Sequence, residues 1–256
     1  EYFANLKWDG VKRLDSWLHT YCGAYGDDDE YISAVGAKWL CAAVARIFEP
    51  GKKFDSMLIL EGAQNSGKSE VFRQLATIGG ETFFDDSLRI TDLGSKDSIS
   101  KYQGCLILEI AEMSGIGKRD VNELKAAITT REDKIVRKYE NNTTVYPRQF
   151  VFAGTINPTD GYLIDTTGNR RFWPVKVVDS LDVKGLKRDV PQLWAEAVER
   201  YKAGEKLYLE GHIYEMAEAA QSRRMETDVW EDEIQAAIDN DMNLRTAISV
   251  TRMKEI

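Results

Sequence analysis

Hydrophobic residues follow a helical spacing at both ends of the chain. Near the N-terminus, one apolar stripe runs from Leu14 to Tyr21 and a second from Ile32 to Ile47. The same spacing returns after about residue 187, with stripes at 193–201, 213–225 and 230–238. Apolar positions three and four residues apart are typical of amphipathic helices. We therefore expect helical regions on both sides of a different central part.

The central part has short apolar runs instead, at 56–60, 105–109 and 149–154, with helical segments between them. Unbroken apolar runs suit strands that are buried on both faces of a parallel sheet, with crossover helices covering the faces. The sequence therefore predicts an α/β fold with a central, mainly parallel sheet. We expect an N-terminal helical region, a core and a C-terminal helical region, at residues 1–50, 51–186 and 187–256.

A phosphate-binding motif follows the first apolar run directly. Its eight residues are Gly62, Ala63, Gln64, Asn65, Ser66, Gly67, Lys68 and Ser69. A helical pattern over 70–75 follows, so the motif has the strand and helix on either side that phosphate binding requires. We expect Lys68 to neutralise the phosphates of ATP and the Ser69 hydroxyl to bind Mg²⁺. The alternative is a glycine turn with a chance Lys-Ser pair.

Polar side chains follow the second and third apolar runs. Glu109 and Glu112 stand at the end of the second run, about 40 residues after Lys68, and Asn157 ends the third. Ligands bind at the carboxyl edge of a parallel sheet. We assign Glu109 to Mg²⁺, directly or through water, and Glu112 to polarising the attacking water, although the two roles are exchangeable. Asn157 is expected to contact the γ-phosphate or that water. Solvated residues after a strand are the alternative for the two acids.

Two adjacent arginines, Arg170 and Arg171, precede an aromatic pair. A guanidinium group suits phosphate, and an arginine from a neighbouring subunit can stabilise charge in the transition state. On an extended segment the two side chains would point to opposite faces. One would then reach a nucleotide while the other forms an internal ion pair, and the sequence does not say which. A purely structural pair of salt bridges is the alternative.

The net charge of −8 opposes binding of nucleic acid or anionic membrane by the chain as a whole. Among the sections of the chain, 131–180 is positive, with a net charge of +2. Two stretches rich in β-branched and aromatic residues flank 140–143 there, which predicts a hairpin. Lys134, Arg137 and Lys138 would offer cations to single-stranded or forked DNA. A solvated charged hairpin is the alternative.

The remaining features restrict the location of the protein. Three cysteines, Cys22, Cys41 and Cys105, stand far apart in apolar surroundings, so we expect reduced packing residues in a cytoplasmic protein. No unbroken apolar run approaches the roughly 20 residues that a membrane span requires, so no membrane partner is expected. The acidic run 27–30 predicts a helix start. The chain begins without Met, and we expect it to be a fragment of a longer protein.

Together these motifs resemble the virulence-associated protein E family of phage and mobile-element proteins, whose core is similar to superfamily 3 helicases within the AAA+ ATPases. The resemblance covers nearly the whole chain and rests on 39–46, 50–55, 62–69, 109–112, Asp133 with Arg137 and Tyr139, 155–157 and 167–174. It implies a hexameric ring active in DNA replication, with nucleotide between subunits. Arg170 or Arg171 would act across the interface, and 134–148 would face a central channel. One departure is that the family pattern has Pro-Tyr after the arginine of the basic segment, whereas this chain has Lys138-Tyr139.

The leading hypothesis is an ATP-hydrolysing DNA helicase or translocase motor that acts in replication of a phage or mobile genetic element. A nucleotide-dependent assembly or regulatory ATPase without unwinding activity would use the same motifs and stays open. A small-molecule kinase shares the phosphate loop, but it would need an acceptor pocket and a lid for which the sequence offers no candidate.

Overall fold

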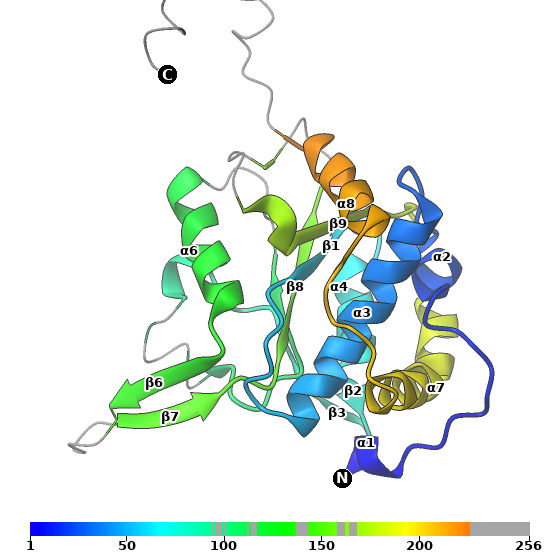
Figure 1. Cartoon of the computed structure of the whole chain (residues 1–256), viewed down its shortest axis with the longest axis horizontal. Coiled ribbons are helices and arrows are strands. Elements are labelled where there is room, and N and C mark those ends of the chain that lie inside the picture. Colours follow the sequence, from blue (N-terminus) through cyan, green and yellow to red (C-terminus); the bar gives the residue numbers. More distant parts are fainter. Residues whose placement is uncertain are drawn as a thin grey trace, which may run out of the picture.

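A five-stranded parallel sheet lies at the centre of the computed structural model (Figure 1). The structure describes residues 1–93, 95, 99, 101–111, 113, 117–136, 143–157, 162–163 and 168–225. The strands are β1 (Met57–Glu61), β4 (Phe84–Asp85), β5 (Ile107–Ile110), β8 (Val151–Ile156) and β9 (Phe172–Lys176). They lie in the order β4-β5-β8-β1-β9, and all neighbours pair in parallel. The predicted α/β fold is confirmed.

The three predicted strands are present, but each begins one or two residues later than the apolar run that indicated it. The start of β5 shows why. The amide of Cys105 donates to the carbonyl of Tyr102 in a turn, and the amide of Leu106 donates to the carbonyl of Phe83. Both side chains are buried although neither residue is yet in the strand. An apolar run therefore reports burial, which extends beyond the paired backbone.

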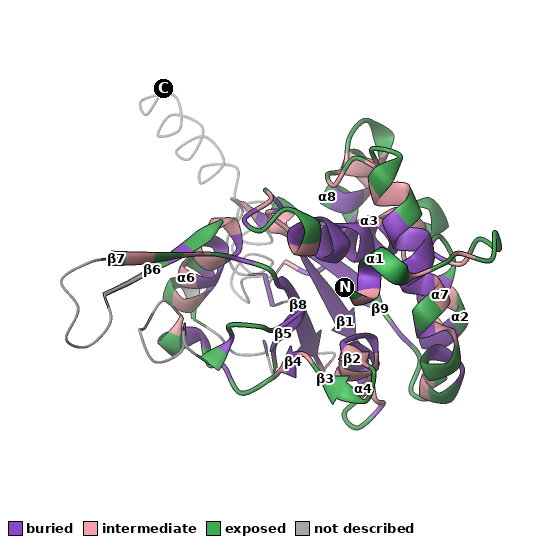
Figure 2. Cartoon of the chain, turned by 90° about the horizontal axis from the view of Figure 1, so that it is seen from below, coloured by how far each residue is buried: buried purple, intermediate pink, exposed green. Residues whose placement is uncertain are grey.

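Alternate residues of the strands contribute to two hydrophobic clusters, as the twofold repeat of a strand requires. In β1, Leu58 and Leu60 join the cluster that includes α3 (Asp29–Phe48), α4 (Lys68–Leu75) and α7 (Val183–Lys202). Met57 and Ile59 join the cluster that includes α6 (Lys118–Thr129). Figure 2 shows the sheet buried between these two layers of helices.

The other elements are short and lie around this core. They are α1 (Tyr2–Asn5), α2 (Trp17–Cys22), α8 (His212–Ser222), the antiparallel pair β2 (Thr77–Ile78) and β3 (Glu81–Thr82), the hairpin β6 (Glu132–Val136) and β7 (Thr143–Pro147), and the 3-10 turns η1 (Ile90–Asp92) and η2 (Asn169–Arg171). The hairpin was predicted, and it projects away from the sheet in Figure 1.

Helix α3 corrects one expectation, because it is 20 residues long and its mean hydropathy of 1.3 would suit a membrane span. However, 72% of that apolar window is buried inside the fold, so α3 is a core helix. Arg46, near its end, is also buried. It donates to the backbone carbonyls of Phe150 at 2.6 Å, Phe54 at 2.9 Å and Lys52 at 3.1 Å. These contacts join α3 to the segments that lead into β1 and β8.

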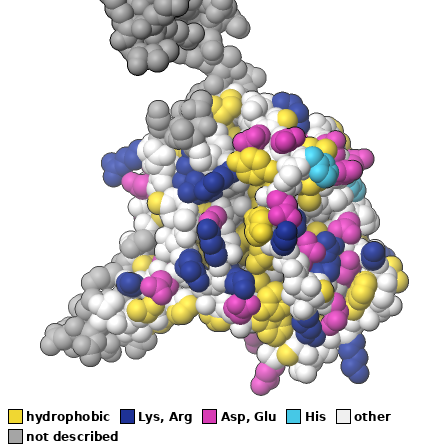
Figure 3. Space-filling model, in the orientation of Figure 1, with side chains coloured by type: hydrophobic (Ala, Val, Ile, Leu, Met, Phe, Trp, Pro, Cys, Tyr) yellow, Lys and Arg dark blue, Asp and Glu magenta, His cyan; other side chains and the backbone are white. Residues whose placement is uncertain are grey.

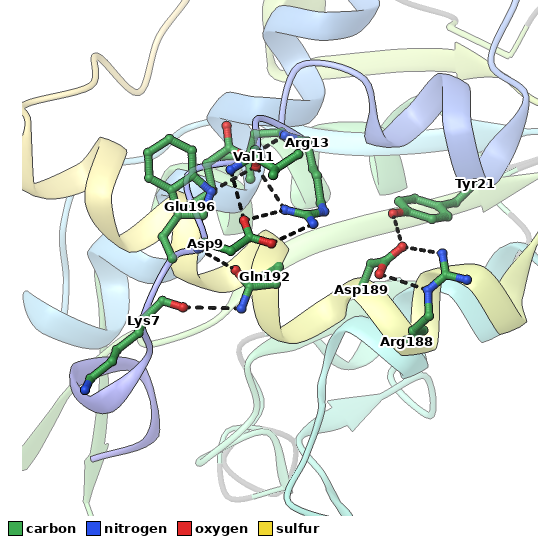
Figure 4. A network of polar contacts seen from close by, with 11 residues as sticks. Lys7, Asp9, Val11, Arg13, Tyr21, Arg188, Asp189, Gln192 and Glu196 are labelled. Carbon is green, nitrogen blue, oxygen red and sulfur yellow. Dashed lines mark hydrogen bonds and ion pairs between the residues drawn. The ribbon is translucent and has the colours of Figure 1, made fainter.

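The N-terminal segment is tied to α7 (Figure 4). The buried carboxylate of Glu196 accepts from the backbone amides of Arg13 at 2.6 Å and Leu14 at 3.0 Å. The Tyr21 hydroxyl donates to Asp189 at 2.8 Å. Since Asp182 caps α7, this helix starts before the boundary that we placed after residue 186. The division into three regions stays a prediction, and the stripe at 230–238 lies outside the described residues.

The three cysteines are free and buried, in agreement with a packing role. Burial raises the pKa of the Cys22 and Cys41 thiols to about 12 and that of Cys105 to about 11. At the acidic run, the Asp28 carboxylate caps α3 by accepting from the amide of Glu30 at 2.9 Å. The predicted helix start is therefore confirmed, although Asp27 makes different contacts.

Candidate functional site

The phosphate-loop motif joins β1 to α4, as predicted. Its backbone conformation depends on two glycines. Gly67 has a φ of 101°, a left-handed value that side chains disfavour. At Gly62, an added Cβ would lie 2.9 Å from the Val177 side chain and 3.2 Å from its carbonyl oxygen. Helix α4 begins at Lys68, earlier than the expected residue 70, so its N-terminus and positive dipole end directly face the loop.

Lys68 connects the loop to the neighbouring strand. Its buried ammonium donates to the carbonyls of Gly62 and Ala63, both at 2.7 Å, and lies 3.4 Å from Oδ1 of Asn157. Burial lowers the pKa of Lys68, and the charge of Glu109 opposes this effect. The structure thus brings Lys68 and Asn157 together at the carboxyl edge of the sheet, where the sequence placed them.

Glu109 is fully buried and lies beside the phosphate loop. Its Oε1 accepts from the hydroxyls of Ser69 at 2.8 Å and Thr155 at 2.6 Å. Its Oε2 is buried and has no hydrogen-bond partner among the residues that the structure describes. Burial raises the pKa of this carboxyl group, and the two hydroxyl contacts only oppose that rise. A buried carboxylate oxygen without a partner is an acceptor that a cation would satisfy.

These oxygens fit a magnesium ion. Mg²⁺ usually binds one or two carboxylates together with substrate phosphates and water. Ser69 and Glu109 supply a hydroxyl and a carboxylate at one place. Within the described part of the chain, no group of three or more His, Cys, Asp or Glu side chains is arranged to hold a metal. The remaining positions around the ion would therefore belong to phosphate oxygens and water.

Sequence reasoning covered part of this site. Thr155 was assigned no role, yet its hydroxyl orients Glu109. The available signal was a hydroxyl residue near the end of an otherwise apolar strand. Glu112 lies outside the described residues, so its role stays a prediction.

The arginine pair corrects a second expectation, because Arg170 and Arg171 lie in the 3-10 turn η2 and not on an extended segment. Arg171 donates to the Thr129 hydroxyl at 3.0 Å and to the carbonyl of Gly168 at 3.3 Å. Among the described residues neither arginine forms an ion pair, so the expected internal pair is absent there. Arg170 is exposed and lines a cavity of about 590 Å³ with Trp173 and Tyr214. Figure 3 shows basic, acidic and hydrophobic side chains mixed over the described part of one face of the molecule.

The position of η2 decides which site these arginines can reach. Strands β1 and β9 run parallel, with Met57 opposite Phe172 and Glu61 opposite Lys176. The arginines precede β9, whereas the phosphate loop follows β1. The arginines and the phosphate loop therefore lie at opposite ends of the strands. At the usual rise of roughly 3.3 Å per residue, they are separated by about 15 Å.

The basic segment is only partly described. Lys134, on β6, is exposed and lies 3.3 Å from the Glu132 carboxylate. Arg137 and Lys138 lie outside the described residues. At the base of the hairpin, the buried Asp133 accepts two hydrogen bonds from Arg148, at 2.8 and 2.7 Å. This bidentate pair fixes where the hairpin leaves the core.

The sequence matches the model of the virulence-associated protein E-like domain over residues 3–226. The chain belongs to this family. A search of the curated proteins finds no match to this chain. Two solved structures of the NrS-1 C-terminal region, both apo forms of residues 305–718, share its fold at 17% and 18% identity, with TM-scores of 0.55 and 0.57.

These matches cover 99% and 94% of this chain but 61% and 58% of the NrS-1 chains. The chain thus spans about three-fifths of those structures. The comparison shows a common fold, and family membership confirms the resemblance drawn from the motifs.

Proposed function

We propose that this VapE-like domain hydrolyses ATP with Mg²⁺ and drives a DNA helicase or translocase in the replication of a phage or mobile genetic element. The observation that carries the proposal is the 2.8 Å contact between Ser69 and Glu109, together with an Oε2 of Glu109 that no described residue contacts by a hydrogen bond. A chance glycine turn does not explain a fully buried acid at this place. Burying a carboxylate is costly unless it is paired or binds a cation.

Each described residue of the site has a part in this reaction. Lys68 would exchange its loop carbonyls for phosphate oxygens, while the N-terminus of α4 faces the same anion. Ser69 and Glu109 would hold Mg²⁺, which neutralises charge on the phosphates. Asn157 would orient the γ-phosphate or the attacking water, and Glu112 would polarise that water.

Arg170 would act on the nucleotide of a neighbouring subunit. It is exposed at the sheet edge opposite its own phosphate loop, too far away to reach it, whereas Arg171 is held by Thr129. An exposed arginine at that edge suits a ring, in the simplest case a hexamer, with ATP between subunits. The hairpin with Lys134, Arg137 and Lys138 would meet DNA along the channel of such a ring.

The nucleotide site is tested by ATP turnover of the wild type and the Lys68→Ala variant. We expect at least a 100-fold loss, because the variant lacks the cation that neutralises the phosphates. Lys202→Ala is the matched control, since Lys202 is exposed and pairs only with Glu199 among the described residues. Unchanged turnover in Lys68→Ala would refute the assignment.

The motor function is tested by adding single-stranded DNA and by a strand-separation assay. DNA should stimulate turnover, and alanine at Lys134, Arg137 and Lys138 together should weaken the stimulation and reduce the salt dependence of binding. Rings that form with ATP but neither respond to DNA nor separate strands would favour the alternative, an assembly or regulatory ATPase. That alternative needs the same exposed arginine.

A further inference from the structure

A buried ionic cluster lies directly before the phosphate loop and has no part in the proposed reaction. It consists of Asp27, Glu61, Tyr162 and Arg224, all nearly inaccessible to solvent. Glu61 is the last residue of β1, and Arg224 follows α8. The cluster therefore joins segments that are far apart in the sequence at the residue from which the loop begins.

Arg224 stands between the two carboxylates. Its guanidinium donates to Glu61 from Nε at 2.8 Å and from Nη2 at 2.8 Å. It donates to Asp27 from Nη1 at 2.8 Å and from Nη2 at 2.6 Å. The Tyr162 hydroxyl adds a bond of 2.6 Å to Glu61. Such planar, doubly bonded contacts fix the orientation of both acids.

The contacts within the cluster favour the charged forms of Asp27 and Arg224. Burial alone would raise the pKa of Asp27, but hydrogen bonds from Arg224 and Arg223 outweigh burial and lower it. Burial opposes the charge of Arg224, but its bonds to Asp27 and Glu61 outweigh this and raise its pKa. Without Arg224, two carboxylates would face each other in the interior.

The same turn of chain also contacts the other edge of the sheet. The carbonyl of Arg224 accepts from the amides of Tyr162 and Leu163, at 2.9 and 3.0 Å. One turn earlier, Gln221 donates to the carbonyl of Phe172 at 2.9 Å, the residue after the arginine turn η2. The end of α8 thus touches both the start of the phosphate loop and the end of η2.

We propose that Arg224 is a positioning residue for the nucleotide site: through Glu61 it sets where the phosphate loop begins, and through α8 it links that position to the turn carrying Arg170. This inference rests on the proposed function. In a ring, one subunit would then connect the nucleotide it binds with the nucleotide that its arginine contacts.

The experiment measures binding of a fluorescent ATP analogue with Mg²⁺ to the full chain at a temperature where each variant is folded by circular dichroism. Arg224→Gln should weaken binding at least tenfold, and Arg224→Lys should recover part of the loss. Arg223→Gln is the matched control, because Arg223 is half exposed and contacts Asp27 but not Glu61. It should change the affinity less than threefold.

A second readout separates positioning from simple stabilisation. Nucleotide should slow hydrogen exchange at the Tyr162 and Leu163 amides in the wild type but not in Arg224→Gln. If the contacts of Arg224 favour nucleotide binding, bound nucleotide must in turn stabilise those contacts. A folded Arg224→Gln with wild-type affinity would overturn the inference. If that variant does not fold, Glu61→Gln takes its place with the same expectation and the same refuting result. Failure of the wild type to bind ATP would instead overturn the proposed function, and this inference with it.

Discussion

The buried carboxyl group of Glu109 carries a cost in stability that a bound cation would offset. Its carboxyl group is fully buried, and burial raises its pKa. Burial therefore favours the protonated acid more in the folded chain than in the unfolded chain. Ionised Glu109 destabilises the fold above its folded pKa, and this cost is relieved as the pH falls through that pKa. A cation next to Oε2 would reverse the preference.

We predict that Glu109→Gln raises the melting temperature at neutral pH in the absence of Mg²⁺ and nucleotide. Each kcal/mol gained corresponds to about 2–4 °C for a chain of this size. The gain should shrink as the pH is lowered, while added Mg²⁺ and ATP should stabilise the wild type and not the variant. Glu210→Gln, at an exposed acid, is the control. A lower melting temperature for Glu109→Gln at neutral pH would contradict this account.

Residues differ in how far the sequence could place them. Lys68 and Ser69 follow β1 and Glu109 lies in β5, each within a short motif, so neighbouring residues were enough to predict them. Thr155, Glu61 and Arg224 act through contacts between distant segments, 46 residues apart for Thr155 and Glu109 and 163 for Glu61 and Arg224. Nothing next to these residues in the sequence indicates their partners.

Among the elements, α3 depends on a charged residue for its place in the core. Arg46 satisfies the carbonyls of Lys52, Phe54 and Phe150, and burial, together with the charge of Arg148, lowers its pKa to about 10. We predict that Arg46→Met destabilises the fold by about 3 kcal/mol or more, since a buried acceptor left unpaired costs roughly 1–3 kcal/mol. Urea denaturation measures the change.

Arg188→Met is the matched comparison, because Arg188 is largely exposed and should change stability by less than about 0.5 kcal/mol. A similarly small effect at Arg46 would mean that the segments before β1 and β8 find other donors.

The same helix explains one limit of sequence reading at the level of elements. The stripe over 32–47 predicted a helix, but Lys38 and Arg46 interrupt its apolar residues, so no unbroken run indicated a length that would suit a membrane span. The arginine turn η2 was predicted as an extended segment for a different reason. A single 3-10 turn is too short to give a periodic pattern of residues, so its sequence resembles that of an extended segment.

At the scale of the whole molecule, the sheet order creates the site. Strand β8 lies between β1 and β5, which places Thr155 and Asn157 between the phosphate loop and Glu109. The apolar runs predicted β1, β5 and β8 and their parallel direction, but neither β4 and β9 nor this order. The pairing of distant strands leaves no local pattern in the sequence.

If Arg170 serves a neighbouring subunit, two inactive variants should complement each other. We predict that mixing Lys68→Ala with Arg170→Ala restores ATP turnover more than threefold above either variant alone, since some interfaces then combine an intact loop with an intact arginine. Mixing Lys68→Ala with a Lys68→Ala, Arg170→Ala double variant is the control without recovery. Absence of recovery in the first mixture would place the arginine's action within its own subunit or remove it from the reaction.

The buried thiols give the folded chain a practical property. With pKa values of about 12 for Cys22 and Cys41 and about 11 for Cys105, the three side chains hold almost no thiolate at neutral pH and are shielded from reagents. The native protein should therefore behave toward alkylating dyes as if it contained no cysteine. A single cysteine introduced at an exposed position would accept one fluorophore without removal of the native three, so movements of the chain could be followed at one chosen place.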